Sequence, residues 1–139
     1  MIDWQKIQTS WSPRLLSIMR IVVSFLFMAH GAQKILGFPS NQPFPKFPTF
    51  SLLWTAGMLE LFGGFFLFAG IFTRRIAFVL AGEMTVAYFK AHAPAGLWPL
   101  LNHGELALLY CFVFLYLMIA GGGVWSVDAL LSKRRARPH

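Results

Sequence analysis

Long apolar stretches alternate with short polar segments along this chain, and four of them approach the length of a membrane span. They cover residues 15–33, 52–72, 76–89 and 105–120. A helix rises about 1.5 Å per residue and needs roughly 17–25 residues to cross the hydrocarbon core of a bilayer. The third and fourth stretches come closer to that length when residues 88–91 and 102–104 extend them. The pattern predicts one membrane domain, with transmembrane helices at residues 15–36, 50–72, 74–92 and 103–120.

The composition agrees with this pattern. Hydrophobic residues make up 57% of the chain and charged residues only 12%, whereas about a quarter of the residues in soluble domains are charged. Helices joined by short connections pack as antiparallel neighbours. We therefore expect an all-α integral membrane protein whose fold is an antiparallel bundle of four transmembrane helices.

Residues at the expected helix starts fit capping chemistry. The predicted N-caps are Ser12, Thr49, Thr73 and Asn102. Pro13 would then occupy the first helical position, where its missing N–H is harmless. Glu105 stands three residues after Asn102, which is the spacing of a capping box. These signals predict where each helix begins.

Residues 1–14 are expected to form an arm before the first helix. Trp4, Ile7 and Trp11 recur on one helical face, which suits a short amphipathic helix at the lipid headgroups. The alternative is a frayed end whose two tryptophans lie in the aromatic belt of the membrane. The sequence leaves both open.

The basic residues predict an orientation. One set lies in the arm, in the turn after the second helix and in the tail of residues 121–139: Lys6, Arg14, Arg74, Arg75, Lys133, Arg134, Arg135 and Arg137. The opposite loops hold only Lys34, Lys46 and Lys90. Because basic residues favour cytoplasmic loops, we expect both termini in the cytoplasm. The net charge of +7 would then serve mostly to orient the chain in the membrane. No nucleic-acid-binding module accompanies the basic tail, so nucleic acid is not an expected partner.

Three glutamates, Glu60, Glu83 and Glu105, lie inside or at the edge of the apolar stretches. A charged side chain at bilayer depth costs roughly 2.5–3.5 kcal/mol on insertion scales, so such residues usually face the bundle interior and find a partner. Glu60 stands between Gly57 and Gly64, small residues that let another backbone approach. We predict that Glu60 points inward and meets Glu83 or the polar cluster that ends the first helix.

Polar residues gather at the predicted outer end of the bundle. With Glu60 and Glu83, the candidate polar centre or ligand site comprises His30, Gln33, Lys34, His92, Asn102, His103 and Glu105. The alternatives are that Glu105 is only a helix cap, that His92 and His103 are ordinary loop residues, and that Lys34 reaches for the headgroups. The histidines and glutamates share no metal-binding spacing, so no metal site is predicted.

Four blocks of residues follow one another in a recognisable order. They are His30-Gly31-x-Gln33-Lys34, then Glu60-x-x-Gly63-Gly64-x-x-Leu67-x-x-Gly70-x-x-Thr73-Arg74, then Asn102-x-Gly104-Glu105-x-x-x-x-Tyr110, and last Gly121-Gly122-Gly123-x-x-Ser126-x-Asp128. Together they resemble the DoxX family over nearly the whole chain. The family pattern often has a second glycine where this chain has His103, so the resemblance assigns no role to His103.

The resemblance implies a four-helix, multi-pass protein of the bacterial inner membrane that is associated with oxidoreductase systems. Relatives are described as subunits of thiosulfate:quinone oxidoreductase or as membrane partners of redox and detoxification enzymes. It favours a non-catalytic membrane subunit over an enzyme that works alone.

Two function classes are therefore open. In the first, the protein is a membrane subunit that binds a quinone or another amphipathic ligand, with a redox enzyme as its protein partner. In the second, it is a small carrier of a solute or of protons, or a scaffold without redox activity. No haem, flavin or iron–sulfur motif is visible, which argues against unaided electron transfer. The expected partners are the lipid bilayer and either a redox enzyme or further copies of the chain.

Overall fold

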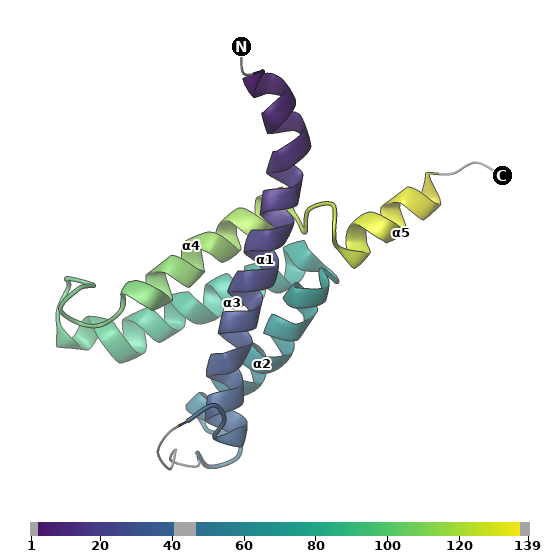
Figure 1. Ribbon diagram of the computed structural model, residues 1–139. Coiled ribbons are helices and arrows are strands. Elements are labelled where there is room, and N and C mark those ends of the chain that lie inside the picture. Colours follow the sequence, from purple (N-terminus) through teal and green to yellow (C-terminus); the bar gives the residue numbers. More distant parts are fainter. Residues whose placement is uncertain (1–2, 41–46, 137–139) are drawn as a thin grey trace.

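The computed structural model describes residues 3–40 and 47–136, and the regular structure in these ranges is entirely helical. Each of the four apolar stretches forms a helix, and a short helix follows them (Figure 1). The elements are α1 (Trp4–Leu36), α2 (Leu52–Ala69), α3 (Thr73–Ala87), the π-helical turn η1 (Tyr88–His92), the 3-10 turn η2 (Ala93–Ala95), α4 (Glu105–Ala120) and α5 (Val127–Arg135).

The helices are arranged as two antiparallel pairs. Helix α1 packs along α2 and α3 packs along α4, while α2 and α3 share a smaller contact. In Figure 1 the α3–α4 pair is inclined to the α1–α2 pair, the start of α1 lies at the top, and α5 runs toward the upper right. The space between the two pairs is where a site can form.

Small residues let α1 and α2 approach closely. A Cβ atom added to Gly31 would lie 2.4 Å from the backbone nitrogen of Leu61, and one added to Gly57 would lie 2.8 Å from the Cβ of Lys34. The expectation that another backbone approaches the Glu60 face of α2 is therefore confirmed.

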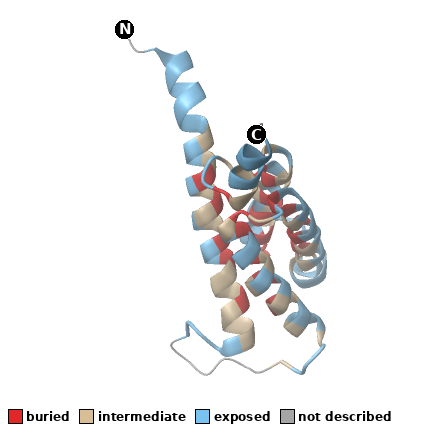
Figure 2. Ribbon diagram, turned by 90° about the vertical axis from the view of Figure 1, so that its right-hand side faces the viewer, coloured by how far each residue is buried: buried red, intermediate tan, exposed pale blue. Residues whose placement is uncertain are grey.

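The core joins both pairs through aromatic rings. The Phe27 ring of α1 lies edge-on to Tyr110 and Phe114 of α4, with centroids 5.0 and 4.8 Å away. The buried residues, red in Figure 2, lie where the helices face one another. Large apolar residues cover the outside, and those at least 50% exposed include Val22, Phe25, Phe65, Phe78, Leu109 and Phe112. An exterior with so many exposed large apolar side chains is unusual for a soluble monomer.

Helices α1 and α2 are long and apolar enough to cross a membrane, judged by length and composition within the described residues. Helix α4 is apolar but shorter, with 16 residues. At about 1.5 Å per residue, the 18 residues of α2 span roughly 27 Å, close to the thickness of the hydrocarbon core.

The predicted boundary at Ser12–Pro13 is wrong. Helix α1 begins at Trp4, where Asp3 accepts a hydrogen bond from the Lys6 amide at 3.1 Å, and it continues through Pro13. Because the helix is capped at Asp3, ten residues before Pro13, it forms on both sides of the proline. The missing N–H of Pro13 costs this helix of 33 residues one hydrogen bond. Part of the expected arm is thus the first section of α1.

The predicted caps of the other helices are also wrong. Ser51, and not Thr49, caps α2 by accepting a hydrogen bond from the Trp54 amide at 3.2 Å. Thr73 is the first residue of α3 and not its N-cap. Residues 102–104 form a turn and not a helical extension, whereas residues 88–91 do extend α3, through the π-helical turn.

Arg20 organises the end of the molecule near α5. Its guanidinium is fully buried and donates to the carbonyls of Gly122 at 2.8 Å and Trp125 at 2.7 Å. It also donates to the carbonyls of Leu67 and Phe68, which lie in the last turn of α2. One side chain therefore satisfies a helix C-terminus and fixes the segment between α4 and α5.

Two more side chains cap distant helices at this end. The Asp128 carboxylate of α5 accepts hydrogen bonds from the amides of Phe72 at 2.9 Å and Thr73 at 2.8 Å, at the start of α3. Arg74 donates to the carbonyls of Met118 and Ile119, near the end of α4. We call this set of contacts, made by Arg20, Arg74 and Asp128, the Arg20 junction.

Candidate ligand-binding site

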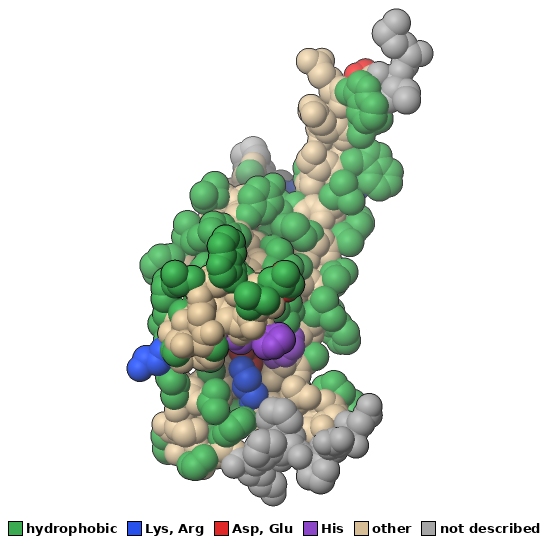
Figure 3. Space-filling view, turned by 90° about the vertical axis from the view of Figure 1, so that its left-hand side faces the viewer, with side chains coloured by type: hydrophobic (Ala, Val, Ile, Leu, Met, Phe, Trp, Pro, Cys, Tyr) green, Lys and Arg blue, Asp and Glu red, His purple; other side chains and the backbone are tan. Residues whose placement is uncertain are grey.

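A polar cavity of about 220 Å³ opens between the two helix pairs, at the end of the bundle away from the Arg20 junction. Its polar lining comes from His30, Lys34, Glu60, His92, His103 and Tyr110. Phe27, Met84, Ala87, Leu106 and Ala107 complete the wall. Figure 3 shows histidine side chains beside a lysine or arginine side chain, on a face that is otherwise largely hydrophobic.

An ion pair forms one wall of this cavity. The Lys34 Nζ atom of α1 lies 2.5 Å from Glu60 Oε1 of α2, and Glu60 is only 3% exposed. The other carboxylate oxygen, Glu60 Oε2, is buried and has no hydrogen-bond partner among the described residues. The prediction that Glu60 points inward and meets the cluster at the end of the first helix is confirmed.

His92 is positioned by the π-helical turn and by the loop that follows it. Its Nδ1 atom lies 3.0 Å from the carbonyl oxygen of Asn102, and its ring stacks on Tyr88 with centroids 6.4 Å apart. The extra residue of a π-helical turn changes the direction in which the following side chains point. The turn brings His92 to the cavity that Lys34 and Glu60 also line.

Asn102 is buried and organises the loop before α4. Its side-chain oxygen accepts a hydrogen bond from the Gly104 amide at 2.8 Å, and its amide group donates to the Gly96 carbonyl at 2.7 Å and to the Tyr88 hydroxyl at 3.4 Å. The predicted capping box is therefore wrong, because Gly104 is the N-cap of α4 and makes no side-chain hydrogen bond. Asn102 supports the site through the loop and does not line the cavity.

An apolar groove of about 370 Å³ adjoins the cavity. Aliphatic side chains of α2 and α3 form most of its walls, among them Leu52, Leu53, Leu59, Val79 and Val86. Lys34, Glu60 and His92 line both spaces. The Lys34–Glu60 pair thus stands between a polar cavity and an apolar groove.

Glu83 lines the groove and not the cavity. Both of its carboxylate oxygens are buried and have no hydrogen-bond partner in the described part of the chain. Of the two partners that the sequence allowed for Glu60, the structure shows Lys34 and not Glu83. Glu60 forms an ion pair with Lys34, whereas Glu83 lies in a mainly aliphatic wall.

Comparison with known proteins identifies the family. The DoxX family model matches residues 15–93. The chain belongs to the DoxX family. It is 38% identical over 128 residues to an uncharacterized protein of Haemophilus influenzae, covering 89% of this chain and 96% of the relative. It is 31% identical over 122 residues to the inner membrane protein YqjF of Escherichia coli, covering 84% and 92% of the two chains. No solved structure matches the chain.

As a DoxX protein with an apolar exterior, the chain is a membrane protein. The blocks that resemble the DoxX family divide between the two ends of the molecule. His30, Lys34, Glu60 and Tyr110 line the polar cavity. The others lie at the Arg20 junction and take part in its hydrogen bonds to the backbone: Gly70, Thr73, Arg74, Gly122 and Asp128. The junction residues of the DoxX pattern thus have a structural role here.

Besides Glu83 and Asn102, two more predicted site residues, Gln33 and Glu105, do not line the cavity. The Gln33 side chain donates to the Pro39 carbonyl at 3.2 Å, in the segment after α1. Glu105 is exposed at the start of α4. His103 does line the cavity, although the DoxX resemblance assigns it no role.

Sequence reasoning overlooked other residues. Phe27 and Met84 line the cavity, but apolar residues within apolar stretches carry no distinguishing signal. Arg20 did carry one, because it is a lone arginine inside the stretch of residues 15–33. In the described residues, no group of three His, Cys, Asp or Glu side chains is placed to hold a metal ion.

Proposed function

We propose that this DoxX protein is a membrane subunit or partner of an oxidoreductase system and binds a quinone-type amphipathic molecule between its helix pairs. The observation that carries the proposal is the Lys34–Glu60 pair, which separates a polar cavity from an adjoining apolar groove. An amphipathic ligand needs this combination, since its head must form hydrogen bonds while its tail stays among apolar side chains. Together the two spaces fall in the range of roughly 300–1,000 Å³ that is usual for small-molecule sites.

The polar lining has the right chemistry for both redox forms of a quinone. Quinone carbonyl oxygens accept hydrogen bonds, and the Lys34 ammonium and the Tyr110 hydroxyl are donors. The hydroxyl groups of the reduced form donate, and Glu60 Oε2 is a buried acceptor that no described residue occupies. The aliphatic walls of the groove would take the tail. The partner that exchanges electrons with the ligand would be a separate redox enzyme.

The test is a binding titration of the purified protein in detergent with a short-tailed ubiquinone analogue. Glu60→Gln removes the carboxylate that pairs with Lys34, and we expect the affinity to fall by about tenfold or more, because the ligand loses an acceptor and Lys34 loses its partner. Tyr110→Phe keeps the ring and removes only the hydroxyl, so a smaller loss of affinity is expected.

Glu105→Gln is the matched control, because it makes the same chemical change at an exposed glutamate outside the cavity. Its affinity should equal that of the parent protein. Equal losses in Glu60→Gln and Glu105→Gln, or equally tight binding of a tail without the quinone head, would refute the proposed site. Thermal unfolding of each variant shows whether a loss of binding is only a loss of fold.

A proton or solute carrier is the second candidate, and Glu83 is the observation that favours it. Its buried carboxyl group has no hydrogen-bond partner among the described residues and lies beside an ion pair, so it offers a place for a proton or a cation. In proteoliposomes that contain a pH-sensitive dye, a proton carrier would produce a proton flux, and Glu83→Gln would abolish it. A quinone-binding subunit would produce none.

We also propose that all four long helices cross the bacterial inner membrane, with both termini in the cytoplasm. The two ends of the described chain lie at the same end of the molecule (Figure 1). The basic residues at the start of α3 and in α5 lie at that end too, and basic segments favour the cytoplasmic side. The partner would be a redox enzyme or a second copy of the chain.

A further inference from the structure

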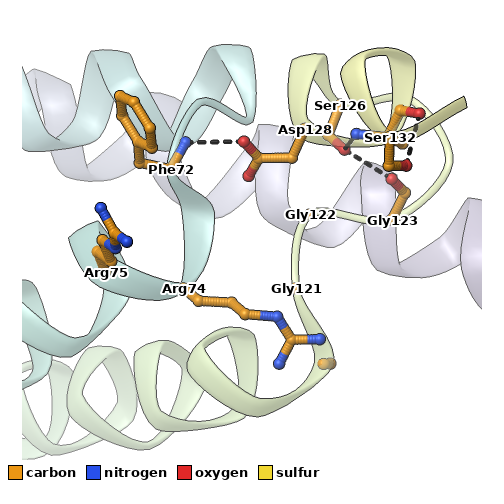
Figure 4. A pocket seen from close by; sticks show the side chains of 11 residues that line it. Phe72, Arg74, Arg75, Gly121, Gly122, Gly123, Ser126, Asp128 and Ser132 are labelled. Carbon is orange, nitrogen blue, oxygen red and sulfur yellow. Dashed lines mark hydrogen bonds between the residues drawn. The ribbon is translucent and has the colours of Figure 1, made fainter. Parts of the chain in front are cut away.

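A second concave surface lies at the Arg20 junction, far from the polar cavity. Two adjoining hollows of about 620 and 550 Å³ share Phe72, Asp128 and Ser132. The first is bounded by the α2–α3 turn, the Gly121–Gly123 segment and α5 (Figure 4), and the second by Phe72 and α5. We call them together the junction groove.

The walls of the junction groove are fixed by hydrogen bonds. Beyond the two bonds to its carboxylate, Asp128 donates its own amide to the Gly70 carbonyl at 3.0 Å. The Ser126 hydroxyl caps α5 by accepting from the Ala129 amide at 3.1 Å. The first turn of α5 is therefore attached to the α2–α3 turn, and the groove is formed before any ligand arrives.

The charge of the junction groove is positive. Arg74, Arg75 and Arg135 line it, and Asp128 is the only acidic residue among the described residues that line it. The Asp128 carboxylate already accepts two backbone hydrogen bonds. Among residues 3–40 and 47–136 the one ion pair is Lys34–Glu60, so neither Arg75 nor Arg135 has a carboxylate partner there.

Apolar side chains stand beside these cations. Phe72 is 60% exposed and Leu131 is 49% exposed, and both line the groove. The Arg75 guanidinium carbon lies 5.9 Å from the centroid of the Phe72 ring. A free anion would use only the arginines, whereas a ligand with an anionic head and an acyl chain would also cover the exposed apolar side chains.

The position of the groove along the helices decides the class of ligand. It lies where α2 and α4 end, so in a bilayer crossed by these helices it is at the level of the lipid headgroups. Arginine binds phosphate through two parallel hydrogen bonds, and basic segments next to membrane helices attract anionic lipids. We propose that the junction groove binds the phosphate headgroup of an anionic phospholipid through Arg75 and Arg135, with acyl carbons against Phe72 and Leu131.

The test measures lipid retention by native mass spectrometry. The full chain is reconstituted in nanodiscs of mixed phosphatidylglycerol and phosphatidylcholine, and released into detergent. We expect the parent protein to retain phosphatidylglycerol preferentially. Arg75→Gln and Arg135→Gln should each lower the retained fraction by about threefold or more, because each removes a cation that lines the groove.

Arg134→Gln is the matched control, because Arg134 is adjacent, has the same charge and does not line the groove. It should leave retention close to that of the parent. Leu131→Gln changes no charge and should also lower retention, since it removes part of the apolar wall.

Three results would overturn the proposal. Equal losses in Arg134→Gln and Arg135→Gln would mean that only diffuse surface charge attracts lipid. Equal retention of both lipids by the parent would mean that the headgroup charge is not recognised. Displacement of phosphatidylglycerol by millimolar inorganic phosphate, with no effect of Leu131→Gln, would mean that the groove takes a soluble phosphate instead.

Discussion

Arg20 and Glu60 are the two charged residues that the described part of the molecule buries, and their partners are of different kinds. Glu60 is neutralised by the ammonium group of Lys34. Arg20 has backbone carbonyls as its partners, and these belong to α2 and to the segment between α4 and α5. Arg20 should therefore matter for folding and Glu60 for the site.

Replacing Arg20 by Met should be among the most destabilising single changes in the protein. It leaves several buried carbonyls without donors, so we expect a loss of about 3–5 kcal/mol in the free energy of unfolding. Thermal unfolding in detergent, followed by circular dichroism, measures the effect. Arg14→Met is the control, because Arg14 is exposed and its guanidinium only approaches the Trp11 ring, at 5.5 Å. Similar melting temperatures for the two variants would contradict this role of Arg20.

Among the elements, the helices could be predicted from the sequence and their ends could not. The apolar stretches predicted each helix, because helix formation depends on the periodicity and length of a local segment. The end of α2 depends on Arg20, and the start of α3 depends on Asp128, 55 residues away in the chain. Rules that look only for a cap next to the helix therefore chose Thr73, whose amide is in fact bonded to Asp128.

The close contact of α1 with α2 depends on Gly31, and Gly82 provides a control. An added Cβ at Gly31 would lie 2.8 Å from the Gly57 carbonyl oxygen and closer still to the Leu61 amide nitrogen, so Gly31→Ala should push the helices apart. We expect it to lower the melting temperature and, by moving Lys34 away from Glu60, to weaken ligand binding.

Gly82→Ala serves as the matched control within α3. No atom lies within 4 Å of a Cβ added at Gly82, so the variant should be neutral or stabilised by up to about 1 kcal/mol through the higher helix propensity of alanine. Destabilisation by Gly82→Ala comparable with that by Gly31→Ala would mean that backbone proximity is not what Gly31 provides.

At the scale of the whole molecule, part of the candidate site could be predicted from the level of each residue along its helix. His30, Lys34 and His92 were expected at the same end, and the structure places all three around one cavity. Depth does not fix the direction in which a side chain points. Gln33 and Lys34 are successive residues and so differ by about 100° around the helix. Only Lys34 faces Glu60, and Gln33 bonds to the segment after α1.

The proposed topology makes a prediction about which surfaces are accessible from outside the cell. If four helices cross the membrane, the start of α1 and the end of α5 lie on one side and the loop with η2 lies on the other. Single cysteines at exposed positions Ser10, Ala95 and Ser132 report these three places. The background is Cys111→Ala, which removes the one native cysteine from a buried position with a small apolar replacement.

In intact spheroplasts, a membrane-impermeant maleimide should label Ala95→Cys and leave Ser10→Cys and Ser132→Cys unlabelled until the membrane is permeabilised. The expectation follows from the basic residues around α5 and the α2–α3 turn, because moving several arginines across a bilayer is costly. Labelling of Ser10→Cys and Ser132→Cys from opposite sides would require an odd number of spans. Labelling of both from outside would reverse the orientation, and the polar cavity would then open toward the cytoplasm.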